Sequence, residues 1–249
     1  MIIEHPRETT QLRQLWKETF GDEDTFLDAF FSLGYAPHRC LCAREGEKVL
    51  SAAYWMEVCT ERGRFAYVYA VATNQAYRGR GIGKKLLTQA HEVLRAQGYD
   101  GVILVPAEPW LFAFYEKLGY ERFCNLQEIT VQAAPPRITL KELSPEDYML
   151  ARRERLPRGG VRQEGAFLAV LASYHRFFAG EDCLLCCYQD GDTGVIPEFW
   201  GDREILGAVA AALGVQQVRV RCAGGSSPFA MYLPLKNGEA PSYFALALD

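Results

Sequence analysis

Residues 78–85 read Arg-Gly-Arg-Gly-Ile-Gly-Lys-Lys. A β-rich run over 64–73 precedes them, and a helical pattern follows, with an apolar stripe at 82, 86, 90 and 93 and an expected end at Gly98. Glycines allow a tight backbone curl, and a helix start presents free N–H groups and the positive end of its dipole. With the basic side chains added, this stretch predicts a phosphate-binding loop at the start of a helix.

Other loop types fit residues 78–85 less well. A dinucleotide-binding G-x-G-x-x-G loop would need glycine where Lys84 stands, and the Walker pattern is absent from the sequence. A solvated basic helix cap would explain a lone G-x-G, but here a strand precedes the loop and a strand–helix unit follows it. A nucleotide-binding protein of another fold therefore stays as an alternative.

Strand and helix patterns alternate on both sides of the loop, which predicts an α/β fold with an antiparallel meander in its first half. The expected elements, in chain order, are a helix after Thr9 or Thr10, a helix after Asp22, strands over 40–43, 49–58 and 64–73, the helix after the loop, a strand over 101–107, a helix over 110–118 and a strand over 122–132.

Pro135-Pro136 marks the expected boundary between two domains, 1–134 and 135–249. The chain of 249 residues is long enough for two small domains, and its 49% hydrophobic residues suit a packed core. A net charge of −4 disfavours a nucleic-acid partner. We expect a cytoplasmic protein without a membrane partner, because the apolar runs are too short for a membrane helix and the N-terminus lacks a signal-peptide pattern.

The second half repeats parts of the first in weakened form. Residues 97–99, which precede one expected strand, resemble 213–215, and residues 112–115 resemble 229–232 at nearly the same offset. Two matches in the same order suggest a duplication, with chance resemblance as the alternative. At this offset the Gly-rich loop would fall on 194–199, which read Gly-Val-Ile-Pro-Glu-Phe. The second half is therefore expected to lack the loop.

Eight cysteines in a chain without a secretory signal are expected to be reduced thiols. Cys183, Cys186 and Cys187 include one C-x-x-C spacing, but a zinc site would need a second pair, and the sequence has none. We therefore expect no metal site.

The loop at 78–83 matches the signature [RQ]-x-x-G-x-[GA] of the GNAT family of acyl-CoA-dependent N-acetyltransferases, and the sequence resembles that family over residues 64–122. A later helix motif, Phe-Tyr-Glu-Lys-Leu-Gly-Tyr at 114–120, stands in the family's order and spacing. The resemblance implies a mixed, mostly antiparallel sheet flanked by helices, and the internal repeat suggests two GNAT-like halves in tandem. It also implies that the two N-terminal helices roof the acceptor cleft.

The resemblance implies acetyl-CoA as the acyl donor and assigns its site. The expected binding residues are Val71, Ala72, Thr73, Arg78, Gly79, Arg80, Gly81, Ile82, Gly83 and Lys84. The loop would bind the pyrophosphate, the strand would pair with the pantetheine arm, and an N–H near Val71 would face the thioester oxygen. Tyr115 stands where the family has the tyrosine that protonates the leaving thiolate; a core aromatic is the alternative.

The general base is the weakest part of the resemblance. The family often has a glutamate on the strand before the loop, where this sequence has Tyr67 and Tyr69. Glu57 on the neighbouring strand is the candidate substitute, with an exposed strand carboxylate as the alternative. We expect transfer of acetyl to a primary amine of a small molecule or peptide, in a direct ternary complex. The alternative is a CoA-binding pseudoenzyme or regulatory module without turnover. Neither the acceptor's identity nor the oligomeric state follows from the sequence.

Overall fold

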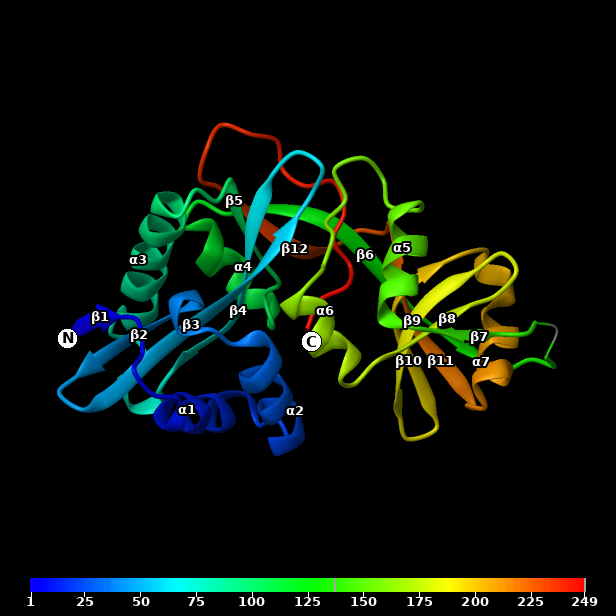
Figure 1. Ribbon diagram of the computed structural model, residues 1–249, viewed down its shortest axis with the longest axis horizontal. Coiled ribbons are helices and arrows are strands. Elements are labelled where there is room, and N and C mark those ends of the chain that lie inside the picture. Colours follow the sequence, from blue (N-terminus) through cyan, green and yellow to red (C-terminus); the bar gives the residue numbers. More distant parts are fainter. Residues whose placement is uncertain (137, 249) are drawn as a thin grey trace.

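A computed structural model describes residues 1–136 and 138–248, which form one twelve-stranded sheet with helices on both faces (Figure 1). The strands lie in the order β1-β2-β3-β4-β5-β12-β6-β11-β10-β9-β8-β7. Their bounds are β1 Ile2–Glu4, β2 Cys40–Glu45, β3 Lys48–Cys59, β4 Arg64–Thr73, β5 Gly101–Leu104, β6 Glu121–Gln132, β7 Lys141–Leu143, β8 Arg176–Ala179, β9 Leu184–Asp190, β10 Thr193–Trp200, β11 Gln217–Ala223 and β12 Ser227–Pro234. The α-helices are α1 Thr10–Phe20, α2 Asp24–Ala29, α3 Ile82–Ala96, α4 Pro109–Glu116, α5 Pro145–Arg153, α6 Ala166–Ala172 and α7 Leu206–Leu213.

The predicted fold class, a mostly antiparallel mixed sheet flanked by helices, is confirmed. β2, β3 and β4 form the expected antiparallel meander. One predicted cap is wrong, because α2 begins at Asp24 after Glu23. Asp22 instead accepts a hydrogen bond of 2.7 Å from the indole N–H of Trp16, so its carboxylate fixes the orientation of this α1 side chain.

Alternate side chains of the first meander enter two cores on opposite faces of the sheet. On one face, α3 packs over β2, β3 and β4, with Leu86 and Leu94 buried against Trp55. On the other face α1 packs over β3 and β4, with Trp16 buried beside Tyr54. This alternation follows from the two-residue period of a strand and explains why β3 reads as almost wholly apolar.

The second lobe repeats the order and pairing of the first. In the first lobe an antiparallel series β1 to β4 is followed by α3 and by β5, which is parallel to β4. The second lobe has the antiparallel series β7 to β10, then α7, then β11 parallel to β10. Figure 1 shows the two lobes side by side, with β6 running between them. This shared topology is compatible with the proposed tandem of two GNAT-like halves.

Two details of the predicted repeat are wrong. Residues 229–232 belong to strand β12, whereas 112–115 belong to helix α4, so their sequence match is not a structural one. Positions 194–199 lie inside β10, so the connection that corresponds to the Gly-rich loop is 201–205. That connection reads Gly-Asp-Arg-Glu-Ile, with one glycine and two acidic residues.

The last part of the chain returns to the first lobe. β12 lies between β5 and β6 and is antiparallel to both. Beyond it, Phe244, Leu246 and Leu248 are buried in the same core as Trp16 and Tyr54. The predicted division into 1–134 and 135–249 stays a prediction, but residues from the second range complete both the sheet and the core of the first.

A buried ion pair fixes the second lobe. Arg152 of α5 donates to Glu198 of β10 through Nε at 2.5 Å and through Nη2 at 2.9 Å, and both side chains are at most 1% exposed. Tyr148 adds a hydrogen bond of 2.9 Å to the same carboxylate. Burial alone would raise the pKa of Glu198, but the Arg152 charge and the hydrogen bonds to the carboxylate together outweigh burial and lower it. The carboxylate is therefore ionised in the folded protein.

Replacing Glu198 with Leu is expected to reduce the free energy of unfolding by about 3–5 kcal/mol, because it leaves the Arg152 charge buried without a partner. The double variant Arg152→Met/Glu198→Leu removes both charges and should recover most of the loss. Urea unfolding at pH 7 measures both values. A double variant no more stable than the single one would show that the network contributes by shape rather than by charge.

Candidate functional site

The loop between β4 and α3 depends on glycine at two positions. Gly79 and Gly81 have φ of +76° and +73°, in the left-handed region where other residues are strained. A Cβ at either position would meet no atom within 4 Å, so the loop presents an open backbone surface there. At Gly83 the constraint is a close approach, since a Cβ would lie 3.2 Å from Oγ1 of Thr73. The helix start is thus held against the end of β4.

The start of α3 offers unpaired donors and positive charge. Its first intrahelical hydrogen bond runs from Lys85 N to Gly81 O, so the N–H groups of 82–84 lack helical acceptors. Arg78, Arg80 and Lys84 are exposed beside them. Among the described residues, no carboxylate lies within ion-pair distance of these three cations. Free N–H groups, a helix dipole and uncompensated cations are features suited to binding a phosphate group.

β4 also has a free edge just before the loop. Its parallel pairing with β5 covers only Phe65–Tyr67, opposite Gly101–Ile103. Toward its end β4 pairs only with β3 on the other side, where Thr73 faces Ser51. The two strands therefore diverge, and residues 71–73 present their backbone toward the opening between them. An extended ligand can pair with such an edge as an added strand.

A β-bulge sits at this opening. The register of β4 against β3 shifts by one residue between Tyr69 and Ala72, and Ala70 has φ of +52°. A bulge takes backbone groups out of the ladder and redirects them. A left-handed conformation at a non-glycine residue is uncommon and often marks a functional site. The bulge therefore frees backbone groups near Val71, where the sequence predicted the N–H for the thioester oxygen.

Tyr115 of α4 lies in the apolar core under α3. Its side chain is 7% exposed, and Val71 packs against the same cluster. Its ring makes edge contacts with Phe114 at 5.2 Å and Tyr120 at 5.5 Å. Burial raises the pKa of Tyr115 to about 12, so the phenol keeps its proton at physiological pH. Tyr115 and Val71 therefore share one apolar core, and the phenol of Tyr115 is protonated.

Glu57 is not part of this constellation. It faces Ala66 across the β3–β4 ladder, five residues and about 16 Å along β4 from Val71. Its carboxylate accepts from Arg64 at 2.6 Å and from the hydroxyl of Tyr99 at 3.3 Å. The distance separates Glu57 from the predicted thioester position, and the ion pair gives this exposed carboxylate a structural partner.

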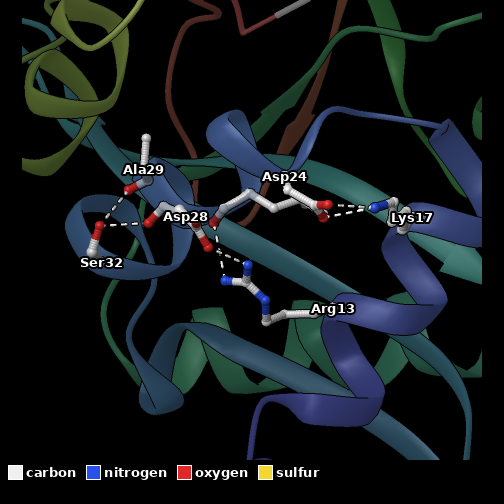
Figure 2. A network of polar contacts seen from close by, with 7 residues as sticks. Arg13, Lys17, Asp24, Asp28, Ala29 and Ser32 are labelled. Atoms are coloured by element: carbon white, nitrogen blue, oxygen red, sulfur yellow. Dashed lines mark hydrogen bonds and ion pairs between the residues drawn. The ribbon is translucent and has the colours of Figure 1, made fainter.

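Helix α1 packs on the other face of β4, and α2 packs in the same core. Figure 2 shows how they are joined: Lys17 contacts both oxygens of Asp24 at 2.7 Å, and Arg13 pairs with Asp28. Trp16 of α1 and Phe30, which directly follows α2, are fully buried, which makes them core residues. Beside them, Tyr69 of β4 is half-buried. That these helices roof an acceptor cleft stays a prediction.

A cleft of 540 Å³ lies where the end of β4 meets α1. Its lining combines residues 74–76 and Arg78 with Glu18 and Thr19. Arg78 is fixed there by a hydrogen bond of 3.0 Å from Nε to the carbonyl of Thr73. Glu18 and Thr19 were not predicted from the sequence, because an exposed Glu-Thr pair on a helix is typical of any solvated helix face. Only the packing of α1 on β4 brings them to the loop.

The comparisons with known proteins agree with this geometry. A family model described as an acetyltransferase (GNAT) domain matches residues 5–123. The N-terminal half belongs to the GNAT acetyltransferase family. The matched region contains the loop, the free edge of β4 and Tyr115. No curated protein sequence matches the chain.

Solved GNAT structures extend the likeness in fold to nearly the whole chain. A GCN5-related N-acetyltransferase from Kribbella flavida is 17% identical with a TM-score of 0.70, over 93% of this chain and 70% of that one. Another from Anabaena variabilis is 14% identical with a TM-score of 0.70, over 94% and 73%. One from Sphaerobacter thermophilus is 14% identical with a TM-score of 0.57, over 98% of both chains. The two-lobed fold is thus shared with other GNAT proteins.

No helix in 1–136 or 138–248 is both long and apolar enough to cross a membrane. In the same residues no group of three or more potential metal-ligating side chains comes together, and Cys183, Cys186 and Cys187 are all buried as free thiols.

The bulge generates a prediction about stability. Ala70→Val places a β-branched side chain at φ +52° and should reduce the free energy of unfolding by about 1–2 kcal/mol. Ala70→Gly is the matched control and should be at least as stable as the parent, because glycine adopts this conformation without strain. Urea unfolding compares the three proteins. Equal losses in both variants would mean that packing of the side chain, and not the backbone conformation, matters at this position.

Proposed function

We propose that this protein is an N-acetyltransferase that moves an acetyl group from acetyl-CoA to a primary amine, and that residues 71–84 form its coenzyme site. The observation that carries the proposal is the divergence of β4 from β5 after Tyr67, directly followed by a bulge and an open glycine loop on a helix start. These features fit the parts of the coenzyme in order: thioester, pantetheine arm and pyrophosphate.

The residues of the loop fit the anionic end of the coenzyme. The pyrophosphate accepts hydrogen bonds from the N–H groups of 82–84, while Gly79 and Gly81 leave room for its oxygens. Arg78, Arg80 and Lys84 supply charge that no described carboxylate neutralises. The free edge at Val71, Ala72 and Thr73 then pairs with the amide groups of the pantetheine arm.

The bound thioester supplies the electrophilic carbonyl carbon that a neutral amine attacks. An N–H at the bulge near Val71 stabilises the negative charge that develops on the carbonyl oxygen, and it does so without reorganisation because the bulge is already formed. Tyr115 donates its proton to the departing thiolate. A phenol that stays protonated up to about pH 12 is in the form that a proton donor needs.

The amine must lose a proton before it attacks, and β4 has no carboxylate to accept it. An alkylamine with a pKa of about 10.4 is neutral only to about one part in a thousand near pH 7.4. Glu57 is too far along β4 to act at Val71 and is left out of the proposal. We propose that water carries this proton away and that the acceptor is a small-molecule or peptide amine.

A second candidate is a CoA-binding module without turnover. The observation that favours it is the pair Tyr67 and Tyr69, which occupy the strand positions of the usual glutamate. Both functions share the coenzyme site and differ only in transfer.

The coenzyme site is tested first by binding. Gly81→Glu adds bulk and a negative charge beside the pyrophosphate and should weaken acetyl-CoA binding about a hundredfold, the loss expected for two charge-assisted hydrogen bonds. Gly98→Glu is the matched control, because Gly98 also has a positive φ, +83°, but lies beyond the other end of α3. Calorimetric titration with acetyl-CoA measures both. Equal affinity in the two variants would exclude the loop as the pyrophosphate site.

Turnover separates the two candidates. Tyr115→Phe should slow acetyl transfer about a hundredfold while acetyl-CoA affinity stays within twofold, because only the proton donor is lost. Tyr120→Phe is the control, since it removes another buried phenol from the same core. Mass spectrometry of a panel of amines incubated with acetyl-CoA detects the product. Transfer at the parent rate by Tyr115→Phe would remove this residue from the reaction, and binding without any transfer by the parent would favour the module without turnover.

A further inference from the structure

A cleft with a volume of 610 Å³ lies at the opposite end of β4 from the loop. Its lining comes from three parts of the chain: the turn before β2, the facing ends of β3 and β4 with the α3–β5 connection, and the segment before α6. The lining includes Arg39, Glu57, Cys59, Arg64, Arg162 and Glu164. A cleft of this size suits a small organic molecule.

Two arginines of this cleft lack a counter-charge. Arg39 donates through Nη2 to the carbonyl of Gly34 at 3.3 Å, and Arg162 donates through Nη2 to the carbonyl of Thr60 at 2.9 Å. Within the described part of the chain neither guanidinium has a carboxylate within 4 Å, and the Nε atom of each is buried without a hydrogen-bond partner. Holding a half-buried charge in this way is unfavourable unless something else pairs with it.

The acidic residues of the cleft are already engaged. Glu57 binds Arg64 at 2.6 Å, and Glu164 binds Arg153, which lies outside the cleft, at 2.6 Å. Burial raises the pKa of the Cys59 thiol, so this group brings no negative charge. The cleft therefore keeps the two positive charges of Arg39 and Arg162.

The two arginines are fixed on different segments. Arg162 pairs with Cys59 at the end of β3 through two backbone hydrogen bonds of 2.7 and 3.2 Å. Arg39 directly precedes Cys40 of β2, and Cys40 faces Tyr54, which lies on β3 like Cys59. Tyr54 and Cys59 are five residues, or about 17 Å, apart along β3, so the backbones that carry the two arginines are well separated. Two spaced cations favour a ligand with two separate carboxylates over one compact phosphate.

We propose that this cleft binds a small organic dicarboxylate, one carboxylate at Arg39 and the other at Arg162. Each guanidinium can pair with a carboxylate through its remaining N–H groups, the geometry for which arginine is suited. The bound acid would connect β3 and the turn before β2 with the segment before α6, and so join the two lobes. The site is independent of the proposed coenzyme site, since it lies beyond the other end of β4.

Calorimetric titration of the full chain with glutarate tests the proposal, with neutral glutaramide, butyrate and inorganic phosphate as comparison probes. Glutarate should bind with a dissociation constant of about 1 mM or lower, and the other three at least tenfold more weakly. No binding of glutarate at about 10 mM, or equal binding of glutaramide, would overturn the proposal. Tighter binding of phosphate would overturn the dicarboxylate class.

Variants locate the site. Arg39→Gln and Arg162→Gln should each weaken glutarate binding at least tenfold, whereas Arg158→Gln, an exposed arginine of the same segment as Arg162, should stay within twofold of the parent. Thermal melting identifies any variant that fails to fold. Because Arg39 and Arg162 lie on separate segments, the second variant still tests the site if the first one does not fold. Unchanged affinity in a folded Arg39 or Arg162 variant would refute the assignment.

Acetyl-CoA separates this site from the proposed coenzyme site. Glutarate should bind Gly81→Glu as it binds the parent, and saturating acetyl-CoA should not displace it. Displacement would mean that both ligands share one site, and the separate cleft would then be wrong even if the coenzyme loop is right.

Discussion

The early separation of β4 from β5 is the constraint on which the rest of the site depends. Parallel pairing stops at Tyr67, yet β4 continues to Thr73 because β3 still supports its other edge. Backbone groups within a fold require hydrogen-bond partners, so a strand edge left open in this way is stable only where water or a ligand can reach it. The opening between β4 and β5, the bulge at Ala70 and the glycine loop therefore belong to the same end of β4.

The second lobe shows what the same topology does without a site. β10 and β11 repeat the parallel pair, and the register of β10 against β9 also shifts within the strand, between Val195 and Glu198. The following connection is short, its one glycine is closely packed, and it has two acidic residues against one arginine, so it offers a phosphate neither an open backbone nor net positive charge. Glu198 is instead paired with Arg152 inside the core. This lobe thus supports the first one: β12 and the residues after it complete the sheet and core of the N-terminal half.

Local patterns predicted most of the fold, and nonlocal pairing limited the rest. The loop, the meander and α3 follow from glycine spacing and apolar periodicity, which are properties of neighbouring residues. The place of β12 between β5 and β6 does not follow from such local patterns, because the sequence of a short apolar strand does not indicate which strands it pairs with. For the same reason, the sequence match of 229–232 to the helical residues 112–115 did not reveal that 229–232 form a strand. A fixed offset also fails once the two lobes differ in loop length, so it assigned the missing loop to positions inside β10.

The site was predictable to the same extent. Loop residues and Tyr115 are fixed by local motifs, whereas the location of Glu57 depends on register: it faces Ala66, at the far end of β4 from the loop. This end-to-end separation also governs electrostatics. β4 spans about 30 Å, and charges in solution are screened within about 8–10 Å, so the cations of the loop and the arginines of the opposite cleft act on their ligands separately. Coupling between the two ends must therefore pass through the packing of β3 against β4 and not through charge.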